Sequence, residues 1–173
     1  MMPIRTAPCR AGAGGLRAEP ERKIYNWTRT GYRKAVNQEG KGYRLGSTGP
    51  DFFDCSGLTL PSYEAVPNFP GFPGEVRTAE QIYFWMRDHT SPAKRYAQPV
   101  SQADLKTGDL LFFERTAANG RVATHVAFWA GDDTLYHAFS PDTPIGFTSY
   151  SSYFSSRFIG AYRVLGVETV ANG

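Results

Sequence analysis

Short apolar runs separated by turn residues dominate the second half of the chain. Runs of roughly four to eight apolar and β-branched residues, bounded by glycine or aspartate, are typical of buried strands. The pattern predicts strands at 109–113, 123–130, 134–139 and 158–165. Gly131-Asp132-Asp133 separates the second run from the third, so we expect those two strands to form a hairpin.

Helical signals lie in the first half. Apolar residues at Ile24, Trp27, Ala35 and Val36, followed by Gly40, predict a helix over 23–38. This helix would be the first regular element of the folded domain.

Two further helices have clear starting signals. One is expected to begin at Cys55 with Asp54 as its N-cap, and Pro61 should kink or shorten it because proline lacks a backbone donor. The other begins at Thr78, which forms a capping-box pattern with Gln81, and runs to about residue 88.

Segments rich in glycine, proline, serine or aromatic residues separate these elements. Loops are expected at 41–54, 67–76 and 140–156. Helices first and strands later is an α+β arrangement, with the N-terminal helices packed on an antiparallel sheet of about five strands. Residues 1–22 are expected to form a flexible arm, 23–168 a single domain and 169–173 a tail.

The composition indicates a protein with a single hydrophobic core and does not indicate a nucleic-acid-binding or membrane-spanning protein. The 173 residues, 41% of them hydrophobic, suffice for one core. The net charge of +3 is too small and too dispersed to indicate a nucleic-acid partner, but it suits weak attraction to an anionic surface such as a cell wall. No run is long enough to cross a membrane, and the N-terminus lacks the apolar core of a secretory signal.

The candidate chemistry centres on a thiol. The chain has two cysteines, Cys9 and Cys55, too few for a disulfide framework or a Cys-x-x-Cys metal site. Cys55 lies at a predicted helix start, where the helix dipole favours the thiolate that attacks an amide. His125 and His137 would meet at one end of the predicted hairpin, so His125 can serve as base and His137 can orient it.

Structural roles remain open for each of these residues when it is taken alone. An isolated cysteine is usually a small buried hydrophobe, and His125 could be a hydrogen-bonded core histidine. Asp54 could be only a helix cap and Ser56 only a residue of the first turn. Cys9 is expected to be a free thiol on the arm.

The ordered set of motifs resembles the NlpC family of bacterial cell-wall cysteine peptidases. It comprises Tyr43-Arg44-Leu45-Gly46, Asp54-Cys55-Ser56-Gly57-Leu58, Gly108-Asp109-Leu110-Leu111-Phe112-Phe113, His125-Val126-Ala127 and Tyr136-His137-Ala138. Both Tyr43 to Cys55 (55 − 43) and His125 to His137 (137 − 125) span 12 residues, and the resemblance extends over about residues 23–165.

The resemblance implies a papain-like cysteine peptidase that cleaves peptidoglycan stem peptides, usually between γ-D-glutamate and the following diamino acid. It implies Cys55 as nucleophile, His125 as base and His137 as third member, without a metal or organic cofactor. Tyr43, Asp54 and Ser56 match positions that hold the free amine of L-alanine in some relatives. The sequence departs from the family pattern in three places: in the residues that follow Tyr43, at Pro61 within the helix that begins at Cys55, and in its long loops. These departures bear on the substrate preference more than on the catalytic residues.

Two other functions stay open. The first is a different thiol reaction, because related folds include acyltransferases and also amidases that cut the muramoyl–L-alanine bond. The second is a non-catalytic module that binds the cell wall, and such a module would be expected to lack the cysteine or one of the histidines. The expected site of action is the cell wall, in the periplasm or outside the cell. Without a recognisable signal, a phage lysis product or a toxin delivered by a dedicated machine is favoured. The sequence identifies no inhibitor or delivery partner.

Overall fold

A computed structural model describes residues 22–90 and 97–169, and its framework is a sheet of seven strands. The order is β1-β9-β5-β6-β7-β8, and β4 pairs with another part of β9. All these pairings are antiparallel. The strands are β1 (Arg22–Asn26), β4 (Ala97–Val100), β5 (Leu110–Phe113), β6 (His125–Gly131), β7 (Thr134–His137), β8 (Gly146–Ser149) and β9 (Phe158–Thr169).

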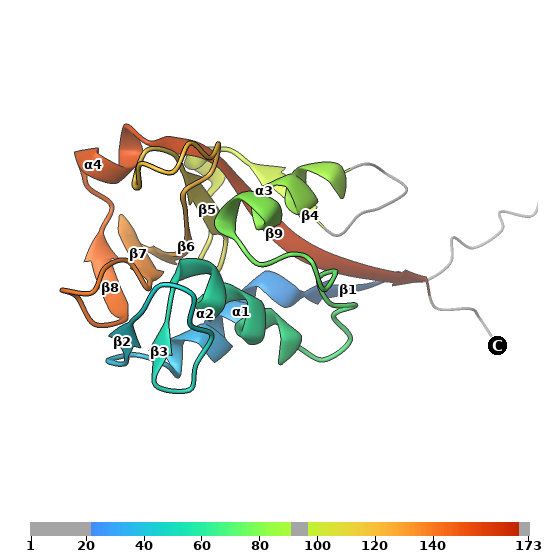
Figure 1. The fold of residues 1–173 in the computed structure, drawn as a ribbon. Coiled ribbons are helices and arrows are strands. Elements are labelled where there is room, and N and C mark those ends of the chain that lie inside the picture. The colour runs from blue at the N-terminus through green and yellow to red at the C-terminus, as the bar shows by residue number, and fades with distance from the viewer. Residues whose placement is uncertain (1–21, 91–96, 170–173) are drawn as a thin grey trace, which may run out of the picture.

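Three helices of ten residues and two short elements complete the fold (Figure 1). These elements are α1 (Trp27–Val36), α2 (Cys55–Glu64), α3 (Ala79–Asp88), α4 (Ser152–Ser155) and the 3-10 turn η1 (Gln102–Asp104). A separate parallel pair, β2 (Gly42–Tyr43) with β3 (Phe52–Phe53), lies on the approach to α2. The α+β class expected from the sequence is therefore confirmed.

The sheet is buried on both faces, which explains why β5 is apolar at every position. Leu110 and Phe112 belong to the core formed with the three long helices. Leu111 and Phe113 point to the other face and join a second core with Trp129. Successive side chains of a strand alternate between faces, so an uninterrupted apolar run is required where both faces are covered.

The structure confirms the predicted starts of α2 and α3. Asp54 caps α2, and its carboxylate accepts a hydrogen bond of 2.6 Å from the Gly57 N–H. Thr78 and Gln81 form the capping box that begins α3. Pro61 is accommodated inside α2, which ends three residues later at Glu64. The predicted hairpin is present as β6 and β7.

Four expectations about the elements were wrong. The expected loop 41–54 contains the short strands β2 and β3. Residues 22–26 are a strand and not the start of a helix, because they pair with β9 at the far end of the chain. The expected loop 140–156 contains β8 and α4. β4, which includes Pro99, was not predicted. With β1, β8 and the four strands assigned from the sequence, it makes a sheet of seven strands in place of about five. β1 and β4 pair with β9, which lies far away in the sequence, so a local pattern could not indicate them.

The ends of the described chain lie together, since Arg22 of β1 pairs with Thr169 of β9. The predicted arm and tail otherwise fall outside the described residues, as does Cys9.

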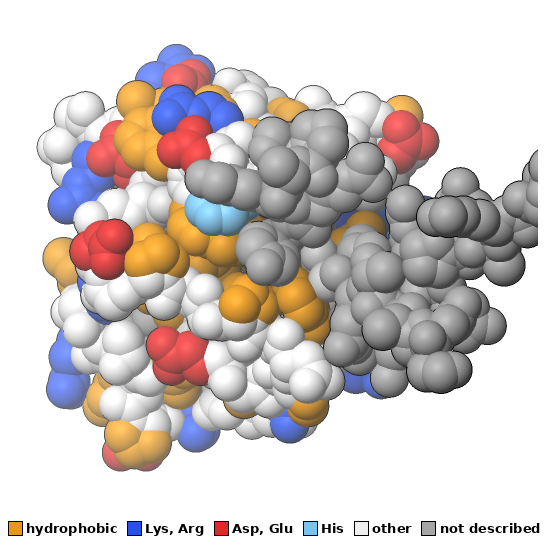
Figure 2. All heavy atoms as spheres, turned by 90° about the vertical axis from the view of Figure 1, so that its right-hand side faces the viewer, with side chains coloured by type: hydrophobic (Ala, Val, Ile, Leu, Met, Phe, Trp, Pro, Cys, Tyr) orange, Lys and Arg blue, Asp and Glu red, His pale blue; other side chains and the backbone are white. Residues whose placement is uncertain are grey.

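Within 22–90 and 97–169, no helix is long and apolar enough to span a membrane. On the face shown in Figure 2, acidic, basic and hydrophobic side chains are interspersed, with no continuous basic stripe over the described part.

Candidate active site

Cys55 is the first residue of α2, and its thiol lies close to the backbone N–H groups of Val126 in β6 and of Ser56, both of which lower its pKa. The predicted helix start therefore places the thiol against the beginning of the strand that carries His125. Cys55 keeps partial exposure to a cleft, as a nucleophile requires.

His125 and His137 are in direct contact. His125 is the first residue of β6 and His137 the last of β7, so the hairpin brings both to the same end of the sheet. His125 Nε2 lies 2.8 Å from His137 Nδ1, and both side chains are buried. The juxtaposition expected from the sequence is confirmed, and it leaves Nδ1 as the ring nitrogen of His125 available to a thiol.

Burial decides the charge state of the site. It lowers the pKa of His125 well below its ordinary value, helped by the neighbouring His137, and lowers the pKa of His137 to about 4. It also raises the pKa of Cys55 to about 11. At neutral pH the site therefore rests as a thiol and two neutral imidazoles.

This charge state differs from the activated thiolate expected at a helix start. The Val126 and Ser56 N–H groups and the charge of Arg77 do lower the pKa of Cys55. The burial of the thiol and the nearby Asp54 carboxylate both raise the pKa of Cys55, and together they outweigh these three effects. Desolvation of a charged group is the larger effect because nothing in the low-dielectric surroundings replaces the lost water.

Aromatic side chains surround the two imidazoles. The Phe139 ring stacks on His137 at an interplanar angle of 8° and meets His125 edge to face at a centroid distance of 5.1 Å. Phe154 packs against both histidines from α4. The polar contact to His137 in this shell is Thr148 of β8, whose Oγ1 lies 2.8 Å from His137 Nε2.

Asp54 does more than cap α2. Its carboxylate accepts hydrogen bonds from the backbone of Gly46 at 2.8 Å and Gly57 at 2.6 Å. It also accepts two bonds from the Arg77 guanidinium, at 3.0 and 2.7 Å. The Ser56 hydroxyl donates to Asp54 at 3.3 Å and accepts from Arg77 at 2.7 Å. The result is a closed network of ionic and backbone bonds at the start of α2.

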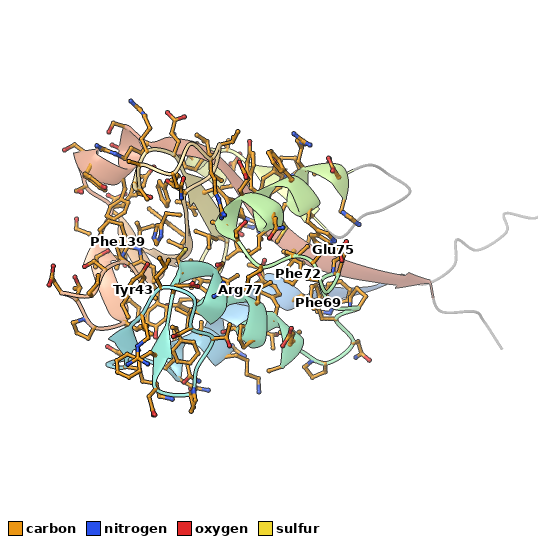
Figure 3. All side chains as sticks on the ribbon, in the orientation of Figure 1. Tyr43, Phe69, Phe72, Glu75, Arg77 and Phe139 are labelled. Carbon is orange, nitrogen blue, oxygen red and sulfur yellow. The ribbon has the colours of Figure 1, made fainter. Side chains whose placement is uncertain are left out.

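Arg77 is the site residue that sequence reasoning missed. It precedes the capping box of α3 and pairs with a carboxylate 23 residues earlier, so no local pattern links the two. Figure 3 shows Arg77 beside α2, with Tyr43 to its left. The available signal was a lone arginine immediately before a helix cap, which by itself indicates nothing about the thiol.

A cleft of about 360 Å³ opens onto the thiol. The candidate substrate-binding residues Tyr43, Asp54 and Ser56 all line it. Burial, and then the proximity of Cys55 and Asp54, raises the pKa of Tyr43, so its phenol stays protonated and can donate a hydrogen bond. The rest of the lining comprises Leu45, Gly46, Cys55, Arg77, Thr78, Ala79, Ala117, Asn119, Arg121, Ala123 and Thr124.

Other hollows do not offer the same chemistry. The two larger ones, of about 650 and 460 Å³, lie near η1, and neither is lined by a cysteine or histidine. In the part of the chain that the structure describes, no group of three or more His, Cys, Asp or Glu side chains could hold a metal ion. The thiol cleft is therefore the candidate active site.

The resting thiol predicts a distinctive pH dependence of alkylation. A pKa near 11 means about 100-fold less thiolate at pH 7 than a solvated thiol has, so iodoacetamide should modify Cys55 slowly. The rate should keep rising with pH to beyond pH 9. Peptide mass spectrometry would follow Cys55 in the native and the urea-unfolded chain. Faster modification in the native chain at pH 6–7 would contradict a protonated resting thiol.

The Asp54 network predicts an effect on stability. Arg77→Met removes the counter-charge of a buried carboxylate, and because Arg77 is itself partly exposed we expect a loss of about 1–3 kcal/mol. Arg87→Met is the matched control, since its partner Asp88 is exposed and the expected loss is below about 0.5 kcal/mol. Urea unfolding measures both. Equal stability of the two variants would show that the network contributes little.

Comparison with known proteins agrees with this geometry. Residues 40–163 match the model of the NlpC/P60 family. Over 162 residues the chain is 33% identical to murein DD-endopeptidase MepH of Escherichia coli K12, covering 92% of this chain and 54% of that protein. It is 40% identical over 67 residues to the gamma-DL-glutamyl hydrolase of Bacillus subtilis 168, covering 38% and 16% of the two chains. The chain thus spans about half the length of the E. coli relative.

A solved structure of the same family is similar to this chain over most of its length. A lipoprotein-like NLP/P60 family protein of Staphylococcus aureus Mu50 superposes with a TM-score of 0.60 at 30% identity, over 85% of this chain and 44% of that one. The fold is the papain-like α+β fold expected from the sequence. Because the family match runs from the start of β2 into β9 and includes the cysteine and both histidines, this chain belongs to the NlpC/P60 family.

Proposed function

We propose that this chain is a cysteine endopeptidase that hydrolyses an amide bond in the stem peptides of peptidoglycan. The observation that carries the proposal is the His125–His137 hydrogen bond, at the end of β6 that also contacts the Cys55 thiol. The names of the E. coli and B. subtilis relatives support the substrate class. The proposed site of action is the bacterial cell wall.

The proposed reaction begins from neutral groups. As the Cys55 sulfur attacks the amide carbonyl, His125 Nδ1 takes the thiol proton, and Nε2–H donates to His137. The backbone N–H of Cys55 lies at the start of α2, where it can stabilise the oxyanion, and the Tyr43 phenol is a second donor in the cleft. The imidazolium then protonates the leaving amine, the C–N bond breaks, and the acyl group remains on the Cys55 sulfur as a thioester.

The second half regenerates the enzyme. A water gives a proton to His125 and attacks the thioester carbonyl, and the C–S bond breaks to release the carboxylic acid. The proton returns to the Cys55 sulfur, so atoms and charge balance over the cycle. Because the imidazolium forms in a buried site, it depends on the hydrogen bond from His125 Nε2 to His137.

The scissile bond is the finer part of the proposal. The sequence-based hypothesis is the γ-D-glutamyl–diamino acid bond, and the B. subtilis relative is named for γ-DL-glutamyl hydrolysis. The relative that matches over 92% of this chain is named for DD-endopeptidase activity. Both activities hydrolyse amide bonds and suit the same chemistry. Muramoyl–L-alanine amidase activity is the competing outcome of the test.

A muropeptide digest tests the reaction and the bond together. The wild-type chain should convert purified muropeptides into fragments cut within the stem, identified by mass spectrometry. Cys55→Ala should reduce the rate by at least about 10³-fold because the nucleophile is lost. Cys9→Ala, which removes the other cysteine, should leave the rate unchanged.

Two results would contradict the proposal. Release of a disaccharide from an intact stem would assign amidase activity instead. Cleavage that persists in Cys55→Ala would remove the thiol from the mechanism. Circular dichroism of both variants ensures that a lost activity reflects chemistry and not unfolding.

A further inference from the structure

Thr148 extends the hydrogen-bonded chain of the site by one group. His125 Nε2 meets His137 Nδ1 at 2.8 Å, and His137 Nε2 meets Thr148 Oγ1 at 2.8 Å. Thr148 lies on β8, in the segment 140–156 that the sequence indicated as a loop. In the β7–β8 pair, His137 is opposite Gly146, so Thr148 is its diagonal neighbour on the same face.

The direction of these hydrogen bonds determines whether His125 can act as a base. A neutral imidazole carries one N–H. For His125 Nδ1 to accept the thiol proton, Nε2 must carry the hydrogen and donate to His137 Nδ1. His137 must then carry its own hydrogen on Nε2, and that N–H needs an acceptor.

The Thr148 hydroxyl oxygen, 2.8 Å from His137 Nε2, is placed to accept this hydrogen bond. If Thr148 donated instead, His137 would carry its hydrogen on Nδ1, and His125 would carry its own on the nitrogen facing the thiol. Among the described residues, the other ring contacts of His137 are with Phe139 and Phe154, which offer no comparable acceptor. A buried N–H without an acceptor is costly, so the Nε2–H tautomer of His137 requires the hydroxyl.

We propose that Thr148 is a positioning residue that supplies the acceptor for the Nε2–H tautomer of His137 and thereby allows His125 Nδ1 to accept the Cys55 proton. The inference rests on the proposed function, since it concerns the same thiol hydrolysis. Thr148 touches neither the substrate nor the sulfur, and it acts through His137. The role accounts for the Thr148 side chain of β8, which contacts His137 where the neighbouring side chains are aromatic.

Substitution of Thr148 tests this role. Thr148→Val keeps the shape and removes the hydroxyl, and kcat should fall about 10–100-fold with little change in KM, the scale seen when a partner that orients a histidine is lost. Thr148→Ser should restore most of the activity. Thr134→Val is the matched control, because Thr134 lies at the other end of the hairpin and binds only the Asp132 carbonyl among the described residues.

A spectroscopic measurement separates positioning from general stability. In wild-type chain with ¹⁵N-labelled histidine, His137 should show a protonated Nε2 and an unprotonated Nδ1, and Thr148→Val should mix or reverse this pattern. A wild-type Nδ1–H tautomer, or full activity in Thr148→Val, would overturn the inference. Since the tautomer is read without substrate, a wild-type chain that cleaves no stem peptide would refute the proposed function alone.

A separate observation concerns the charge of the cleft. Three charged side chains line it, namely Asp54, Arg77 and Arg121. Asp54 and Arg77 neutralise each other through their paired hydrogen bonds. No carboxylate among the described residues forms an ion pair with Arg121. Of the three charged side chains that line the cleft, Arg121 is therefore the one without an ion-pair partner in the described part of the chain.

The loop that carries Arg121 is anchored on both sides of it. The Arg121 N–H donates to Asn119 Oδ1 at 3.1 Å, and the Val122 N–H donates to Glu80 of α3 at 2.7 Å. The Thr116 and Thr124 hydroxyls are 2.6 Å apart and join the two ends of the loop. The backbone is therefore ordered before ligand binding, which favours a specific contact by its side chain.

We infer that Arg121 binds a carboxylate of the peptide substrate beside the scissile amide. This inference also rests on the proposed function and refines its substrate class. Stem peptides that contain D-glutamate and a diamino acid carry free carboxylates, which some bacteria convert to carboxamides. A guanidinium distinguishes these two groups because it forms paired, charge-assisted bonds only with the anion.

Two synthetic stem peptides that differ only in carboxylate or carboxamide groups test this specificity. The wild-type chain should prefer the acid, and Arg121→Gln should lower kcat/KM for the acid about 10-fold, through KM, without affecting the amide. Arg87→Gln, with the same charge change outside the cleft, should have no effect. Equal cleavage of both peptides, or an unchanged Arg121→Gln, would overturn the inference, whereas no cleavage of either would refute the proposed function.

Discussion

The buried carboxylate of Asp54 is the interaction on which the site depends. It joins three segments, since its donors come from the loop at Gly46, from the first turn of α2 and from Arg77 before α3. A buried anion with this many donors has one stable geometry, because the loss of any donor leaves charge without compensation. Cys55 follows directly, so its position in the cleft is set by the residue before it. The Asp54 carboxylate therefore both caps α2 and fixes the position of the thiol.

The second constraint is the low polarity around the thiol and the histidines. Burial raises the pKa of Cys55 to about 11 and lowers the pKa of His125, so a stable thiolate–imidazolium pair is disfavoured. Proton transfer must then accompany attack, and the direction of each hydrogen bond becomes important. The chain from His125 through His137 to Thr148 gives that direction a structural basis.

Substrate recognition has a different origin from the chemistry. The reacting groups lie on α2, β6 and β7, which are regular elements fixed by the two cores. The cleft walls come from the segments before α2, before α3 and between β5 and β6. Among the charged side chains of these walls, Asp54 and Arg77 form an ion pair, whereas Arg121 has no ion-pair partner among the described residues. A change in these loops can alter the preferred stem peptide without disturbing the thiol and the histidines.

The sequence by itself determined the α+β class, the starts of α2 and α3, the β6–β7 hairpin and the candidate residues Cys55, His125 and His137. Each of these leaves a local signal in caps, turn residues or strand periodicity. The tertiary structure alone decided the strand character of β1, β4 and β8, the pairing of Arg77 with Asp54, and the contact of Thr148 with His137. It also decided the protonation of the thiol. The pairings of β1, β4 and Arg77 depend on partners far away in the chain. The Thr148 contact depends on the register of the β7–β8 pair, and the protonation of the thiol depends on the loss of water around it. A local stretch of residues records none of these.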